Sequence, residues 1–260
     1  MDHVSALEVV LLALVALLAG GINAVAGGGS LLSFPALLAV GLSPVSANVT
    51  NTMSLVPGYI GGIAGFRDDL PQQRGRIRML LPAAFAGSLI GAVVLLTTSG
   101  AVFRRLVPFL VLAAAVLLLL QPLLQRRLTR LHPETGEPVV HENDAATIAS
   151  VFLAAIYGGY FGAVLGVMLL AVLGTFLPDD VHRLNALKSV LQFATNIIAV
   201  IVFALFGPVQ WLLVLCMAPM SLAGGWIGSR LSRRVHPRIL RTAIGIYGVG
   251  AAITLAITIR

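Results

Sequence analysis

The sequence predicts an all-α polytopic membrane protein, and composition and segment length are the observations behind this prediction. Hydrophobic residues make up 58% of the 260-residue chain, charged residues make up 10%, and the mean hydropathy is +0.98. A soluble domain carries about 25% charged residues and could not hide this much apolar surface from water. Inside a bilayer every backbone N–H and C=O must be paired within the protein, which a helix does alone. A soluble enzyme, a disordered protein and a nucleic-acid binder are therefore excluded, despite the net charge of +7.

Apolar segments follow one another along the chain and differ in length. They lie at about 7–26, 29–41, 47–66, 79–97, 103–124, 145–163, 164–177, 183–206, 209–229 and 238–259. A spanning helix needs about 20 apolar residues, so segments 29–41 and 164–177 are too short to cross comfortably. Each short segment follows or overlaps a glycine cluster, namely Gly27, Gly28 and Gly29 before Ser30, and Gly158, Gly159, Gly162 and Gly166. We expect each long and short pair to be a glycine-broken helix or a re-entrant hairpin.

An internal repeat relates the two halves of the chain. A shift of 137 residues aligns 81–92 with 218–229 without a gap, and Pro82, Ala86, Gly87, Ile90 and Gly91 match identical residues there. The same shift aligns Asn48 with Asn185. The predicted organisation is one membrane domain with an N-terminal half, 1–124, a hydrophilic linker, 125–144, and a C-terminal half, 145–260. Each half would hold one broken helix pair followed by three spanning helices.

The distribution of arginines predicts how the halves are oriented. Arginines cluster at 67–78, 126–130 and 230–238, whereas the loops at 42–46 and 206–209 are uncharged; Arg104 and Arg105 are the exception. Basic loops stay in the cytoplasm, so the linker should be cytoplasmic and both termini outside. The basic loop at 67–78 aligns with the uncharged segment 204–215 of the other half. The two halves should therefore be inverted repeats in the plasma membrane, the bacterial inner membrane.

Acidic residues and histidines indicate what chemistry the protein lacks. All ten acidic residues lie between apolar segments or at their ends, and the five histidines lie in loops or at segment ends. Neither a carboxylate pair for acid–base catalysis nor a cluster of metal ligands is expected within the membrane, and no cofactor is expected. No Walker-type phosphate loop is present either, so we do not expect ATP to drive the protein.

One cation and a polar stripe remain as the candidate binding site. Lys188 is the single lysine of the chain and lies inside segment 183–206, roughly 12 Å from the start of that helix. Asn185, Lys188, Gln192 and Asn196 are spaced by 3, 4 and 4 residues and so share one helix face. The equivalent helix of the first half carries Asn48, Asn51 and Thr52, with Asn51 aligned to Lys188.

A positive charge, amides, hydroxyls and open glycine backbone suit an anion, and half-helix N-termini would add N–H donors. The candidate substrate-binding residues are Lys188, Asn185, Gln192, Asn196, Asn48, Asn51, Thr52, Gly27, Gly28, Gly29, Ser30 and Gly166. Two alternatives remain open: Lys188 snorkels to the cytoplasmic surface, and the glycines serve close helix packing.

At this point the sequence resembles the sulfite exporter TauE/SafE family of membrane permeases. The resemblance rests on residues 26–35 (AGGGSLLSFP), 46–54 (SANVTNTMS), 185–196 (NALKSVLQFATN) and 223–228 (AGGWIG), and it covers nearly the whole chain. The resemblance implies duplicated halves and the movement of sulfite, sulfonates and related sulfur-containing anions.

The expected function is secondary transport of a small sulfur-containing oxyanion such as sulfite or an organosulfonate, in the direction of export. Its expected partners are the anionic solute and membrane lipids, with no nucleic acid. Three alternatives remain: a carrier of another small anion such as a carboxylate, a membrane-embedded enzyme with catalytic loop residues, and a scaffold that binds a partner through 125–144. The sequence leaves the oligomeric state undetermined.

Overall fold

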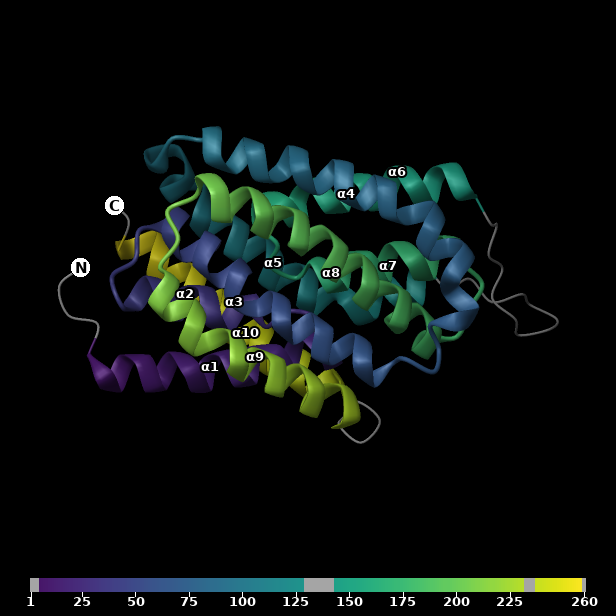
Figure 1. Cartoon of the computed structure of the whole chain (residues 1–260), viewed down its shortest axis with the longest axis horizontal. Helices are drawn as coiled ribbons and strands as arrows, with labels where there is room; N and C mark the ends of the chain where they lie inside the picture. The colour runs from purple at the N-terminus through teal and green to yellow at the C-terminus, as the bar shows by residue number, and fades with distance from the viewer. Residues whose placement is uncertain (1–4, 129–142, 232–236, 259–260) are drawn as a thin grey trace.

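The computed structural model describes residues 5–128, 143–231 and 237–258, and these residues are almost entirely helical (Figure 1). Their α-helices are α1 (Ala6–Val25), α2 (Ser30–Ala39), α3 (Pro44–Gly65), α4 (Arg74–Thr97), α5 (Gly100–Leu128), α6 (Asp144–Tyr160), α7 (Leu165–Phe176), α8 (Val181–Phe206), α9 (Trp211–Leu231) and α10 (Pro237–Thr258). A single 3-10 turn, η1 (Pro71–Gln73), precedes α4. The predicted all-α class is confirmed, while most of the predicted linker 125–144 lies outside the described residues.

Six helices of the described chain are long and apolar enough to cross a membrane: α1, α4 with η1, α5, α8, α9 and α10. The ten residues of α2 span only about 15 Å, half of a bilayer core. Helix α3 has 22 residues, but it is not among these six helices, because its polar side chains lower its mean hydropathy. Large apolar side chains such as Phe109 and Phe206 are 70% and 75% exposed, as lipid-facing surface requires. The protein is therefore a multi-pass membrane protein.

Local sequence signals begin several helices where the structure places them. Ser5 accepts a hydrogen bond from the Glu8 amide, and the Glu8 carboxylate accepts one from the Ser5 amide, which forms a capping box at α1. Ser43 caps α3, where Pro44 occupies the first turn, and Asn143 caps α6 through the Ala146 amide. These caps satisfy amides that the first turn of a helix leaves without partners.

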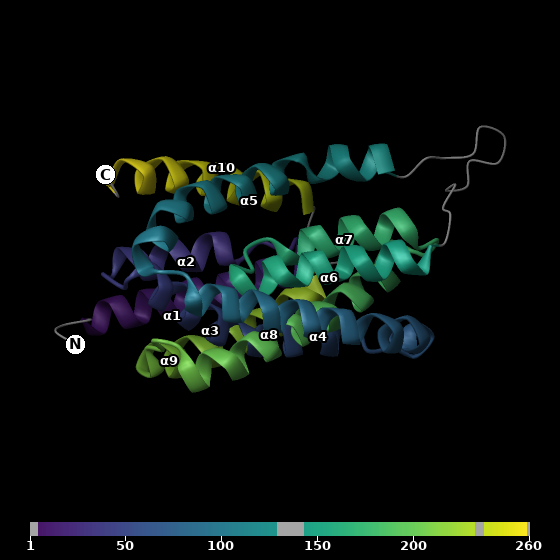
Figure 2. The same ribbon diagram turned by 90° about the horizontal axis from the view of Figure 1, so that it is seen from above.

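The two halves of the chain exchange packing partners. Helix α1 packs on α9 and α6 packs on α4; likewise α3 packs on α9 and α8 on α4. Glycines allow these close approaches, because a side chain at Gly20 would overlap the Ser221 backbone and one at Gly91 would overlap the Ile156 backbone. Helices α5 and α10 pack on each other in a layer at one side of the bundle (Figure 2). Exchanging the two halves reproduces this set of helix pairs.

Equivalent helices of the two halves run in opposite directions. In Figures 1 and 2, α1 begins at one end of the molecule, whereas α6 begins at the other end, where α5 stops. Helix α10 runs in the direction opposite to α5, and its end lies at the end of the molecule where α1 starts. Antiparallel equivalents are the geometry that an inverted repeat requires.

Candidate solute-binding site

The first hairpin turns at the glycine run between α1 and α2. Gly27 adopts φ of 68°, in the left-handed region that favours glycine. The Asn23 side chain then fixes the start of α2, because its Oδ1 accepts hydrogen bonds from the amides of Gly28 (3.0 Å) and Gly29 (2.7 Å). Asn23 is not among the residues predicted from sequence, although an asparagine just before a glycine run is a recognisable capping signal. Ser30 is buried in the first turn of α2.

The second hairpin turns at the equivalent position without a glycine there. Val164 has φ of 63° and aligns with Gly27 under the 137-residue shift. A β-branched residue in this region costs of the order of 1–3 kcal/mol. Gly162, with φ of 71°, is the glycine in this turn, while Gly158 and Gly159 lie inside α6 and Gly166 lies in the first turn of α7. The repeat therefore preserves the backbone break more closely than it preserves the glycines.

The tips of the two hairpins contact each other inside the bundle. A Cβ at Gly27 would lie 3.1 Å from the amide nitrogen of Val167 and 3.2 Å from the Cα of Gly166. On the other side of the first tip, a Cβ at Gly28 would lie 3.2 Å from Leu118 of α5. Gly27 is needed for this approach of two backbones, while Gly28 leaves room for the Leu118 side chain.

The predicted stripe on α8 faces the second hairpin. Lys188, Gln192 and Asn196 are 2%, 3% and 3% exposed, and Asn185 is half-buried. A Cβ at Gly166 would lie 2.8 Å from Oε1 of Gln192, so the stripe reaches the first turn of α7. The side-chain Nδ2 of Asn196 donates a hydrogen bond to the backbone carbonyl of Gln192 at 2.8 Å.

Lys188 is the only buried charged side chain among the described residues. Its ammonium donates to Oδ1 of Asn185 at 3.1 Å, which occupies one of its three N–H groups. The side chain does not reach the molecular surface, as snorkelling would require. A buried cation without a buried carboxylate partner is costly, which makes the position a candidate for binding a negative group.

The predicted stripe on α3 holds the hairpins through neutral hydrogen bonds. Ser33 of α2 donates to Oδ1 of Asn51 at 2.5 Å, and Asn48 donates to the Tyr160 carbonyl at the end of α6 at 3.0 Å. Thr52 donates to the Asn48 carbonyl of its own helix. Asn48, Asn51 and Thr52 are all buried. Helix α3 thus contacts both hairpins, while it also packs on α8.

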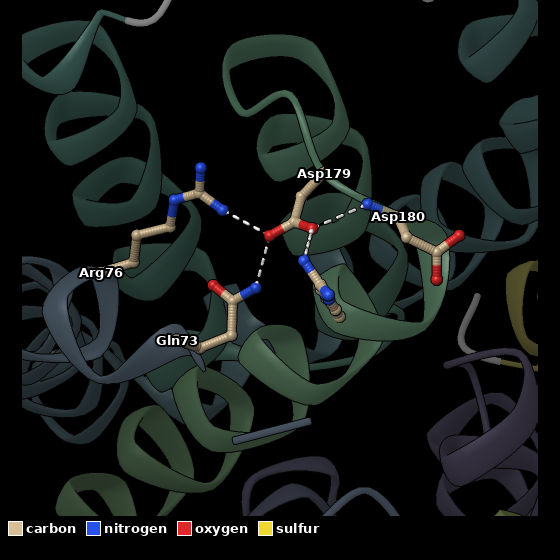
Figure 3. Close-up of polar contacts among 5 residues, drawn as sticks. Gln73, Arg76, Asp179 and Asp180 are labelled. Carbon is tan, nitrogen blue, oxygen red and sulfur yellow. Dashed lines mark hydrogen bonds and ion pairs between the residues drawn. The ribbon is translucent and has the colours of Figure 1, made fainter. Parts of the chain in front are cut away.

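A charged network outside the predicted site joins η1 and α4 to the loop before α8 (Figure 3). Oδ2 of Asp179 accepts hydrogen bonds from Gln73 (2.6 Å) and Arg76 (2.5 Å), and Oδ1 accepts one from the Asp180 amide and pairs with Arg183. Burial raises the pKa of the Asp179 carboxyl, but the hydrogen bonds from Gln73 and the Asp180 amide, together with Arg76, outweigh burial and leave the pKa below its usual value. Sequence reasoning missed this network because its members are over a hundred residues apart.

Two broken helices that meet beside buried polar helices, in a bundle with lipid-facing walls, define a membrane transporter of small solutes. Residues 12–255 match the Sulfite exporter TauE/SafE family, and the chain belongs to this family. The resemblance drawn from the sequence is thereby confirmed.

Similar proteins are named as transporters. The chain is 29% identical over 243 residues to the Probable membrane transporter protein YfcA of Escherichia coli (strain K12), covering 94% of this chain and 87% of that protein. It is 26% identical to a Probable membrane transporter protein of Haemophilus influenzae, covering 89% of this chain and 88% of the relative. The Probable membrane transporter protein ORF9 of Sinorhizobium sp is 27% identical, with 92% and 89% covered. The protein is therefore a multi-pass transporter of the inner membrane and not an enzyme.

Proposed function

We propose that the protein is a secondary transporter that exports a small sulfur-containing oxyanion, sulfite or an organosulfonate. The observation that supports this most strongly is Lys188, a buried cation beside the hairpins with no buried carboxylate among the described residues. Membrane proteins place isolated charges where they bind or move a charged solute, because such charges are otherwise expensive. The family name adds sulfite as the first solute to test.

The predicted residues would divide the binding of the anion between them. Lys188 would supply the positive charge, with two further N–H groups beyond the one bonded to Asn185. Gln192 lies one turn further along the same face, next to Gly166, and Asn196 lies two turns further, near Gly162. Asn48 and Asn51 would keep the hairpins in place, and Thr52 would lie beside Asn48 on α3. Gly27, Gly28, Gly29 and Ser30 would line the solute at the first hairpin turn, where Asn23 fixes the Gly28 and Gly29 amides. An anion would then be held mainly by N–H donors.

The direction of export follows from the membrane potential in this proposal. An inside-negative potential favours the outward movement of one negative charge by about 2.3 kcal/mol per 100 mV. No coupling ion is needed for export of a monoanion down this potential. The protein would then behave as a facilitated exporter, whose flux depends on membrane voltage.

Flux in proteoliposomes tests the proposed function. Purified protein would be reconstituted, and uptake would be measured for sulfite, sulfate, methanesulfonate, acetate and a neutral solute such as glycerol. We expect saturable flux of sulfur oxyanions that responds to an imposed voltage. Faster flux of acetate would assign a carboxylate instead, and flux of glycerol without any anion would refute the proposal.

We further propose that the halves are inverted in the membrane, with both termini outside and the linker 125–144 in the cytoplasm. The opposite directions of α1 and α6 support this, as does the basic segment between α3 and the start of α4, which lies at the end where α5 stops. Impermeant thiol labelling tests it in a Cys216→Ala background. Asp68→Cys should label only from the cytoplasm, and Ser43→Cys and Pro208→Cys only from outside. Labelling of Asp68→Cys and Pro208→Cys from the same side would refute the inverted arrangement.

A further inference from the structure

Arg105 of α5 is a charged side chain that lies apart from the candidate solute-binding site. Helix α5 starts at the end of the molecule where α1 starts, and Arg105 is in its second turn (Figure 2). The side chain is exposed, and none of the ion pairs formed by the described residues includes it. Neither α5 nor α10 carries an acidic residue. The charge of Arg105 therefore has no counter-charge on these two helices.

A groove of about 440 Å³ between α5 and α10 begins at Arg105. This volume lies within the range of small-molecule sites. Pro108 and Ala252 are buried and form the floor of the groove, whereas Phe109 and Ile253, which are 70% and 54% exposed, form its sides. Apart from Arg105 the lining is apolar, and it consists of Pro108, Phe109 and Leu112 from α5 and Ala252, Ile253 and Ala256 from α10. The groove is therefore an apolar channel on the lipid-facing surface with one cation at its end.

The length of the groove matches part of one leaflet of a bilayer. Arg105 and Leu112 are seven residues apart on one face of α5, which is about 10 Å along the helix. One leaflet contributes about 15 Å of hydrocarbon. Beyond Leu112 the two helices close on each other, because Ala115 packs against Gly248. The groove thus ends inside the membrane and is open toward the membrane surface.

Arg105 lies near that surface. It is five residues after Gly100, where the apolar span of α5 begins, so its guanidinium can extend to the level of the lipid headgroups. Arginine binds phosphate with two parallel N–H groups, and acyl chains match an apolar lining. A symmetric contact with a second copy of the chain would bring this surface against itself. Two arginines would then meet without an acidic residue in the lining, so a second copy fits the groove less well than a lipid.

We propose that the groove between α5 and α10 binds one anionic phospholipid. Arg105 binds the phosphate of the headgroup, and an acyl chain lies along Phe109, Leu112 and Ile253. A zwitterionic headgroup carries its own positive charge, which Arg105 repels, so an anionic lipid is preferred. The inference goes beyond the proposed function and does not depend on it, because it concerns the lipid-facing surface and not the transported solute.

Native mass spectrometry of the purified full-length protein in detergent tests the charge. The probes are phosphatidylglycerol and phosphatidylcholine with identical acyl chains. Wild type should bind phosphatidylglycerol more tightly, and Arg105→Gln should weaken this binding about five-fold and leave phosphatidylcholine unchanged. Arg104→Gln is the matched control, because Arg104 is also exposed but does not line the groove. Equal weakening by both variants would reduce the effect to general surface charge and overturn the assignment.

A second variant tests the groove without a change of charge. Ala256→Phe places a large side chain in the groove, so it should weaken the binding of phosphatidylglycerol and phosphatidylcholine alike. Ile257→Phe is its control, because Ile257 is 71% exposed and lies outside the lining. Equal melting temperatures of the two variants would show that both are folded. Binding of phosphatidylglycerol by Ale256→Phe as tightly as by wild type would refute the groove as the site.

The same spectra separate the lipid from other occupants. Glycerol 3-phosphate, which has the phosphate but no acyl chain, should not compete with phosphatidylglycerol. Equal competition by glycerol 3-phosphate would assign a phosphate site without a lipid. A dimer that forms without lipid and is lost in Ala256→Phe would assign the groove to a second copy of the chain and overturn the proposal.

Discussion

Asn51 and Lys188 occupy equivalent positions in the two halves, yet their side chains differ in charge and make different contacts. Asn51 accepts a hydrogen bond from Ser33 of the neighbouring hairpin, so it holds α2 against α3. Lys188 is bonded to Asn185 of its own helix and holds no hairpin. The backbone is duplicated down to the left-handed residues Gly27 and Val164, while the chemistry at this position is not. The two halves therefore share a backbone turn at aligned positions, whereas the charge is present in the second half alone.

The largest effect is expected from Lys188→Gln. Loss of a charged donor removes about 1.5–3 kcal/mol of binding free energy, which lowers anion affinity about ten- to hundred-fold. Lys188→Arg should keep the charge and fit the compact site poorly, giving partial flux. Affinity of purified protein for sulfite is the measurement. If Lys188→Gln binds sulfite within two-fold of wild type, Lys188 does not bind the anion.

A smaller effect is expected where the second hairpin faces α8. Gly166→Ala would place a Cβ 2.8 Å from Oε1 of Gln192, so the end of the Gln192 side chain must move away, at little cost in stability. Because Gln192 belongs to the candidate site, flux per folded protein should fall several-fold. Gly174→Ala in the same helix is the control, since its Cβ would make only an ordinary contact with Leu184. Equal flux in both variants would mean that Gly166 serves packing alone.

Asn51→Ala should reduce stability while affinity changes little. The variant removes the acceptor of the Ser33 hydroxyl, a loss worth about 1 kcal/mol, and it leaves the charge at Lys188 in place. Thermal unfolding in detergent should show a lower melting temperature, and sulfite titration should show nearly unchanged affinity in the folded fraction. A fall in affinity as large as that of Lys188→Gln would make Asn51 a binding residue and remove the contrast between the halves.

The smallest effect is expected at the N-terminal ends of α3 and α8, because different kinds of contact stabilise them. Ser46 donates to the Pro208 carbonyl and Gln210 donates to Thr50 near the start of α3, so this contact is neutral. The equivalent contact near the start of α8 is the charged network around Asp179. Because the folded pKa of Asp179 is lowered, the network stabilises above the unfolded pKa of about 4 and fades as the pH falls through the folded value.

Thermal unfolding at several pH values measures this contribution. Asp179→Asn should be less stable than wild type at neutral pH by about 1 kcal/mol or less, because Arg183 is 46% exposed and solvent screens its charge. The difference should shrink below about pH 4. Asp68→Asn is the control, because Asp68 and its partner Arg67 are 88% and 80% exposed. A difference that persists unchanged in acid would exclude the Asp179 charge as its source.

The helices and the two helix breaks could be predicted from sequence, because each depends on a local property. Segment length and hydropathy located α1, α4, α5 and α8–α10, and the short segments located α2 and α7. The stripe of Lys188, Gln192 and Asn196 followed from helical spacing alone. The second break was located only approximately: the predicted glycine cluster includes Gly162, which has positive φ, but not Val164. A valine with positive φ has no sequence signature, because only the surrounding structure holds it there.

Contacts between distant segments could not be predicted. The pairing of Gln73 and Arg76 with Asp179 depends on the approach of a loop and a helix from different halves. The register of α5 against α10, in which Leu119 packs on Gly245 and Ala115 on Gly248, likewise depends on segments that are over a hundred residues apart. Apolar patterning reports which face of a helix is buried, but it does not say against which helix.

The exchange of packing partners between the halves has a consequence for the making of the protein. Helix α1 is the first described helix to leave the ribosome, but α9, against which its glycine face packs, begins only at Trp211. At about 5–20 residues per second, translation takes about ten seconds or more to supply that partner. During this interval the surface of α1 around Gly20 and Gly21 must remain in contact with lipid or with an insertion factor. Biogenesis, and not the finished bundle, is then the stage at which this glycine face is most vulnerable to mispairing.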